Sequence, residues 1–119
     1  MSSNIYAKVA PLLKERKSNI DMDALLNFMG RYKKNNFIYP GVMHRELKID
    51  IKDVYEILEM GVTEGILEQY LEIYCPRCCR FTGQIFQRLT DIPEDVYCIT
   101  CVEEISNPLK HAIVIYRVI

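Results

Sequence analysis

The sequence lacks an apolar run long enough to cross a lipid bilayer. Its longest uninterrupted apolar stretch is 112–116, whereas a membrane-spanning helix needs about 20 such residues. The N-terminus also lacks the apolar stretch and the small-residue cleavage site of a signal peptide. We therefore expect a soluble intracellular protein in the cytoplasm that makes no membrane contact.

Sequence signatures of common enzymes are absent as well. The chain contains no glycine-rich phosphate loop, no His-Glu-x-x-His motif and no nucleophile elbow. The acidic residues of its C-terminal part fall in expected loops without a histidine partner. Half of the 119 residues are apolar, which is enough for a folded core. We therefore expect a folded protein that is not an enzyme.

The net charge of −1 hides an uneven distribution along the chain. Residues 1–35 hold seven basic and three acidic residues, for a net charge of +4. Residues 36–74 hold three basic and eight acidic residues, for −5, and residues 75–119 hold five of each. Such asymmetry influences which surface meets which partner.

Four cysteines form two Cys-x-x-Cys pairs, Cys75 with Cys78 and Cys98 with Cys101. Each pair presents two thiolates from one tight turn, and two such turns complete a tetrahedral zinc site. Because thiols stay reduced inside cells, metal ligands are favoured over disulfides. Four thiolates saturate the metal and leave no position for water. The pattern therefore predicts one structural Zn²⁺, not a catalytic one.

Two alternatives to this ligand set remain. Unrelated or redox-active cysteines are disfavoured because a thioredoxin-type Cys-x-x-Cys opens a helix in a βαβ context that is missing here. In the other alternative Cys79 replaces Cys78 as a ligand, although the two-residue spacing favours Cys78. We interpret Cys79 as a spare thiol, and His44 and His111 as ordinary surface or core residues.

Apolar spacing predicts four helices. Ile5, Val9, Leu12 and Leu13 mark an N-terminal helix that is kinked at Pro11 or begins there. A core helix is expected over 21–34, with Ser18 and Asn19 before it, followed by a short helix that begins at Pro40. The fourth helix spans 52–64; Asp50 caps it and Gly65 ends it, while its buried stripe continues to Val62.

Extended segments dominate the second half of the chain. Strands are expected over 66–74 and 81–89, with Glu68 and Glu72 on the polar side of the first. The final strand, 111–119, is apolar on both faces. Such a strand is usually buried on both sides, and an open edge would invite pairing with another chain. Self-association through this strand is therefore an expectation.

The order helix, short helix, tight turn, helix and strand over 21–74 resembles a winged helix-turn-helix module. Val42–Leu47 would be its second helix, 52–64 its third, and 65–67 the entry to the wing strand. With the cysteine pairs added, the architecture is similar to the winged helix and zinc ribbon of the transcription factor E alpha subunit. We expect an α+β fold with an N-terminal helical extension (1–20), a winged helix-turn-helix (21–74) and a four-cysteine zinc ribbon with a C-terminal strand (75–119).

The resemblance implies that the third helix reads DNA, as it does in winged helices. DNA binding requires positively charged side chains near the phosphates. Here that helix is acidic. We therefore predict a protein partner for its exposed face, although the acids could equally form a merely solvated surface. The predicted partner-binding residues are Lys52, Asp53, Tyr55, Glu56 and Glu59.

Basic residues elsewhere support a nucleic-acid-binding alternative, with neighbouring aromatic side chains available to stack on bases. Ordinary solubilising charge is the simpler explanation. The residues in this alternative are Arg31, Lys33, Lys34, Arg77, Arg80 and Arg88. Three functions thus remain: a zinc-binding protein-interaction module acting as an adaptor subunit, which we favour, a winged-helix transcriptional regulator, and an accessory subunit of an enzyme.

Overall fold

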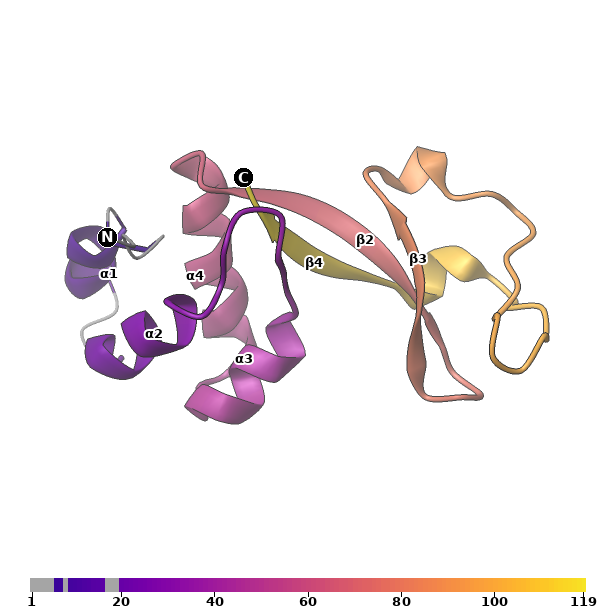
Figure 1. Ribbon diagram of the computed structural model, residues 1–119, viewed down its shortest axis with the longest axis horizontal. Helices are drawn as coiled ribbons and strands as arrows, with labels where there is room; N and C mark the ends of the chain where they lie inside the picture. The colour runs from indigo at the N-terminus through magenta and orange to yellow at the C-terminus, as the bar shows by residue number, and fades with distance from the viewer. Residues whose placement is uncertain (1–5, 8, 17–19) are drawn as a thin grey trace. The chain divides into compact units, whose positions relative to one another are not determined.

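The computed structural model describes residues 6, 7, 9–16 and 20–119 and has a mixed α+β fold (Figure 1). Within these ranges the α-helices are α1 (Ala10–Arg16), α2 (Met22–Met29), α3 (Pro40–Leu47) and α4 (Ile51–Thr63). The strands are β1 (Phe37–Ile38), β2 (Leu67–Cys75), β3 (Arg80–Phe86) and β4 (Ala112–Val118), with short 3₁₀ helices η1 (Leu89–Asp91) and η2 (Pro108–His111). No helix in the described ranges is long and apolar enough to span a membrane.

The chain divides into two compact units, which are described separately below. The first comprises Met1–Glu68 and Tyr116–Ile119, and the second comprises Gln69–Ile115. The α-helices belong to the first unit, and the cysteines belong to the second. The boundaries predicted after residues 20 and 74 stay predictions.

The first two helices are shorter than their sequence patterns. α1 begins at Ala10 and Pro11 is its second residue, so the proline lies in the first turn and does not kink the helix. Ile5 of the predicted stripe, with Ser18 and Asn19, lies outside the described residues. The prediction that α2 continues to residue 34 is wrong. It ends at Met29. The N–H of Gly30 makes the last i→i−4 hydrogen bond, to Leu26, and Arg31 and Tyr32 then make i→i−3 hydrogen bonds in turns.

Local sequence signals place α3 and α4 as predicted. Pro40 occupies the first turn of α3, where its missing N–H costs no hydrogen bond. Lys48 then takes a left-handed conformation with φ 54° and ends the helix. Asp50 caps α4 by accepting a hydrogen bond from the backbone N–H of Lys52 at 3.4 Å. The starts of α3 and α4 are therefore set by residues that the sequence identifies.

Gly61 allows a close approach at the centre of the first unit. It is buried within α4, and a Cβ atom there would lie 2.5 Å from the Tyr6 hydroxyl oxygen and 2.7 Å from Leu67 Cδ1. The Tyr6 hydroxyl is held by donating a hydrogen bond of 2.8 Å to the carbonyl of Ile57, and burial raises the pKa of Tyr6. The buried stripe thus ends at Gly61, and Val62, predicted to continue it, is only half-buried.

The strands form one sheet in the order β1-β4-β2-β3. β1 pairs antiparallel with β4, matching Phe37 with Arg117 and Ile38 with Tyr116. The sequence did not predict β1, because two residues carry no periodicity and the strand exists through its pairing. As an interior strand, β4 has Ile115 and Tyr116 fully buried. Self-association through β4 stays a prediction, and β1 already occupies its edge at Tyr116 and Arg117.

Glu72 corrects the predicted polar face of β2. Its side chain is buried, with 2% of its surface exposed, and it accepts a 2.9 Å hydrogen bond from the backbone N–H of Gly83. The register of β2 against β3 shifts between Glu72 and Tyr74, which marks a β-bulge. Gly83 has φ 81°, a conformation that glycine adopts without strain. The carboxylate thus supplies an acceptor for the backbone at this irregular position.

Candidate metal centre

The two Cys-x-x-Cys turns bring four thiols together in the second unit. One atom from each of Cys75, Cys78, Cys98 and Cys101 lies within 4.8 Å of all the others. Cys75 ends β2, so the hairpin fixes the first pair, whereas the second pair lies in the loop that the bridge between Tyr97 and Glu104 closes. The structure thus assembles the predicted ligands from segments that are twenty residues apart in the sequence.

The spacing of the sulfur atoms fits a tetrahedral metal ion. Thiolates bound to zinc at about 2.3 Å stand about 3.8 Å apart at the corners of a tetrahedron. The measured distances are 3.9 Å between Cys75 Sγ and Cys101 Sγ and 3.7 Å between Cys78 Sγ and Cys98 Sγ. The cluster is therefore compatible with a single structural metal ion.

Both turns share one backbone geometry. The residue after each second cysteine has a left-handed conformation, with φ 55° at Cys79 and φ 60° at Val102. The N–H of Cys79 donates to the carbonyl of Cys75, and the N–H of Val102 donates to that of Cys98, both at 2.8 Å. Cys79 therefore occupies the position where such turns often place glycine. Its thiol is exposed and lies outside the four-thiol cluster.

The cluster is also part of the core of the second unit. Cys75 and Cys98 are buried in this core, and Cys78 and Cys101 are partly buried and pack against it. The apolar members beside them are few: Ile73, Val96 and Ile105 are buried, with Phe86, Ile92 and Ala112 partly buried. The stability of a core this small depends on a metal ion that would hold the four sulfur atoms together.

Backbone and side-chain hydrogen bonds separate the pKa values of two cluster thiols. The backbone N–H groups of Cys101 and Thr100 lower the pKa of Cys98 to about 6, despite its burial. A hydrogen bond with the Cys101 side chain, together with burial, raises the pKa of Cys78 to about 12. The lowered pKa of Cys98 favours the thiolate form that binds a cation, whereas the raised pKa of Cys78 favours its protonated thiol.

The lowered pKa of Cys98 also affects the metal-free chain. The ordinary pKa of a cysteine thiol is 9.0. Above this pH the lowered pKa of Cys98 stabilises the folded state, and this stabilisation is lost as the pH falls through about 6. The raised pKa of Cys78 acts in the opposite sense, favouring the folded state below pH 9.0 and losing that contribution as the pH rises toward 12.

The predicted partner-binding residues all lie on α4, but they are not equally accessible. Lys52, Glu56 and Glu59 are exposed, whereas Asp53 and Tyr55 are half-buried. Glu59 also has an internal contact, since its Oε2 accepts a hydrogen bond of 2.6 Å from the Tyr116 hydroxyl. Their role in binding a partner stays a prediction.

The predicted nucleic-acid residues are divided between the two units, and their role stays a prediction. Arg31, Lys33 and Lys34 belong to the first unit, and Arg31 pairs with Glu46 at 3.0 Å. In the second unit Arg77 pairs with Glu103 and Arg88 with Asp91, each at 3.7 Å. Arg80 begins β3, which is roughly 20 Å long, and Arg88 lies two residues beyond its other end.

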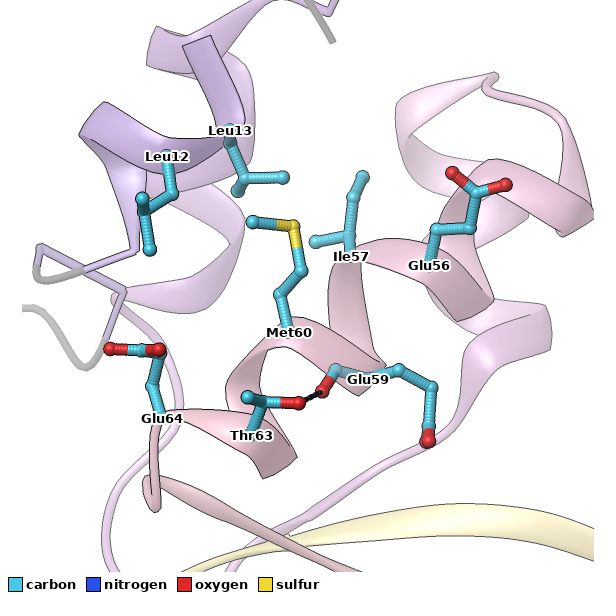
Figure 2. A pocket seen from close by; sticks show the side chains of 8 residues that line it. All are labelled: Leu12, Leu13, Glu56, Ile57, Glu59, Met60, Thr63 and Glu64. Carbon is cyan, nitrogen blue, oxygen red and sulfur yellow. Dashed lines mark hydrogen bonds between the residues drawn. The ribbon is translucent and has the colours of Figure 1, made fainter. Parts of the chain in front are cut away.

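Sequence reasoning did not identify an apolar groove on the first unit. Leu12 and Leu13 of α1 line it together with Ile57 and Met60 of α4 (Figure 2). Leu12, Leu13 and Ile57 lie on apolar helical stripes that the sequence predicts to be core. Leu12 is nevertheless 38% exposed, whereas Leu13 is buried. Only the packing of the two helices distinguishes a core position from a groove position.

The candidate metal centre therefore rests on the geometry of this chain alone. Four thiols from two equivalent turns supply a complete tetrahedral ligand set, and the carboxylates and histidines in the described ranges lie outside that set. No protein-family model matches the chain, and no curated protein and no solved structure is significantly similar to it.

Proposed function

We propose that the protein is a non-catalytic, zinc-binding protein-interaction module that acts as an adaptor subunit of a larger complex. The observation that carries this proposal is the four-thiol cluster, with sulfur atoms 3.7 Å and 3.9 Å apart. A tetrahedral ion held by four thiolates has no ligand position left for substrate or water. Its role is then to hold the second unit together.

The first unit supplies the proposed interaction surface. The succession of α2, α3 and α4 followed by β2 supports a winged helix-turn-helix as part of the proposal. On α4 the exposed side chains include Glu56 and Glu59, and the last turn contains no basic residue. Negative charge at this surface opposes contact with phosphates and favours a protein partner.

A direct test compares metal binding with nucleic-acid binding in the full chain. Mass spectrometry of the native protein should find one zinc ion per chain. Binding of labelled duplex and single-stranded DNA at low salt should stay at background. Micromolar, salt-sensitive DNA binding that Arg80→Glu abolishes and Lys48→Glu preserves would overturn the proposal in favour of the regulator.

A further inference from the structure

The second Cys-x-x-Cys turn exposes two apolar side chains, Ile99 and Val102. The turn lies in the loop between η1 and η2 (Figure 1). Each side chain is 76% exposed, and no other large apolar side chain among the described residues is as exposed. The hydrogen bond from the N–H of Val102 to the carbonyl of Cys98 holds both on one short turn. The turn therefore presents apolar surface that the chain itself leaves uncovered.

Val102 is a costly residue at its position. Its φ of 60° lies in the left-handed region, where a β-branched side chain crowds the backbone and glycine does not. Burial gives no compensation, because the side chain is exposed and does not belong to the core of the second unit. A residue that benefits neither the backbone nor the packing indicates a role outside the fold.

The first Cys-x-x-Cys turn provides an internal comparison. It has the same backbone geometry, with a left-handed residue at Cys79 and the same 2.8 Å hydrogen bond. The residues at the positions of Ile99 and Val102 are Pro76 and Cys79 in that turn. This backbone therefore presents two thiols to a metal without a pair of large aliphatic side chains.

The surroundings of the second turn are negatively charged. Residues 94–104 include four acidic residues and no basic residue. Arg77 of the first turn pairs with Glu103 at 3.7 Å, in a contact where both side chains are more than half exposed. With Arg77 counted, the net charge of this group is −3. The apolar side chains thus project from an acidic part of the surface.

Tyr97 connects the apolar side chains with this charge. It directly precedes the second turn, is 51% exposed and forms a β-bridge with Glu104. A hydrogen bond with the Glu104 side chain raises the pKa of Tyr97, and the negative charges of Glu104 and Asp95 raise it further. Both carboxylates therefore lie near the tyrosine at the base of the turn.

We propose that the second Cys-x-x-Cys turn inserts Ile99 and Val102 into an apolar pocket of a partner protein, with lysine or arginine around the rim of that pocket. Charge complementarity selects this occupant, because the acidic surroundings repel nucleic acids and anionic membranes. The inference rests on the proposed adaptor function and adds a contact surface on the second unit.

The test uses the full chain loaded with zinc and a fluorescein-labelled helical hairpin peptide that presents a groove of leucines bordered by lysines. A matched peptide with glutamate in place of each lysine is the control. We expect micromolar binding of the lysine peptide, weakened by salt, and background binding of the glutamate peptide. Ile99→Ser and Val102→Gly should each weaken binding on the order of tenfold.

Cys79→Gly is the matched control for Val102→Gly, because it makes the same change at the equivalent position of the first turn. It should keep full affinity for the lysine peptide, and both variants should keep one zinc ion. Val102→Gly should also keep or raise the melting temperature, since glycine adopts the left-handed conformation without strain. A lower melting temperature would show that the valine serves the fold and would overturn the inference.

Charge variants test the nature of the partner. Asp95→Asn combined with Glu104→Gln should weaken binding of the lysine peptide several-fold and reduce its salt dependence. Glu64→Gln, an exposed acid of the first unit, should do neither.

Three outcomes would overturn the inference. One is equal binding of the lysine peptide by Val102→Gly and the unmodified chain. Another is binding to phosphatidylserine vesicles that requires Val102, which would identify a membrane as the occupant. The third is a concentration-dependent dimer that Val102→Gly dissociates, which would identify a second copy.

Failure of this inference can be separated from failure of the proposed function. If a natural partner co-purifies with the zinc-loaded chain and is retained equally by Val102→Gly, the inference is overturned and the adaptor function stands. If the chain binds DNA in the manner described above, the adaptor function is overturned whatever the peptide does.

Discussion

Replacing Cys75 by serine is expected to release the metal and to unfold residues 69–115. Serine lacks a thiolate, so the tetrahedral set loses one of its four ligands. Structural zinc sites contribute on the order of 10 kcal/mol of apparent folding free energy, which is comparable with the whole stability of a small domain. The apolar core of the second unit is too small to replace that contribution.

Hydrogen exchange and metal analysis together measure this effect. Amides of Ile73 and Ile105 should lose protection in Cys75→Ser, and the zinc content should fall to background. Cys79→Ser is the matched control, because Cys79 is adjacent in sequence to a ligand but exposed and outside the cluster. It should keep its zinc and its protection. A Cys75→Ser variant that is metal-free but equally protected would refute the metal-dependent core.

Replacing Gly61 by alanine is expected to lower the free energy of unfolding by about 1–3 kcal/mol. In an ordinary helix interior the same change raises stability by about 1 kcal/mol. Here the added methyl group would lie 2.5 Å from the Tyr6 hydroxyl oxygen and 2.7 Å from Leu67 Cδ1. Both neighbours are buried, so neither can move away without disturbing the core.

Two further variants isolate the cause of this effect. Gly41 lies on α3 with nothing within 4 Å of a Cβ atom, so Gly41→Ala should be neutral or raise stability by up to about 1 kcal/mol. Tyr6→Phe removes the oxygen that the new methyl group meets and should recover part of the loss when it is combined with Gly61→Ala. Denaturant unfolding measures each change. A stabilised Gly61→Ala variant would contradict the close approach.

The sequence predicted those features that local chemistry determines. Pro40 and Asp50 set the starts of α3 and α4 without help from distant residues. The cysteine spacing likewise predicted which four thiols meet, because each turn is a local structure with two ligands. The mixed α+β class followed from these elements, whereas the winged-helix assignment stays a prediction.

The features that were missed depend on partners distant in the sequence. β1 exists only by pairing with β4, and Glu72 is buried where its carboxylate accepts a hydrogen bond from the N–H of Gly83 on the neighbouring strand. Leu12, on the expected core stripe of α1, lines a groove because of the way α1 lies against α4. Periodicity describes one segment at a time and therefore cannot detect these relations.

The exposed thiol of Cys79 has a practical consequence for labelling the protein. A bound metal ion would act as a protecting group for the four clustered thiols, since a coordinated sulfur is a poor nucleophile toward alkylating reagents. The fifth cysteine of the chain would remain addressable, because its thiol is exposed. A maleimide dye could then be attached at one defined position without any engineered cysteine, and removing the metal would expose the remaining four sites.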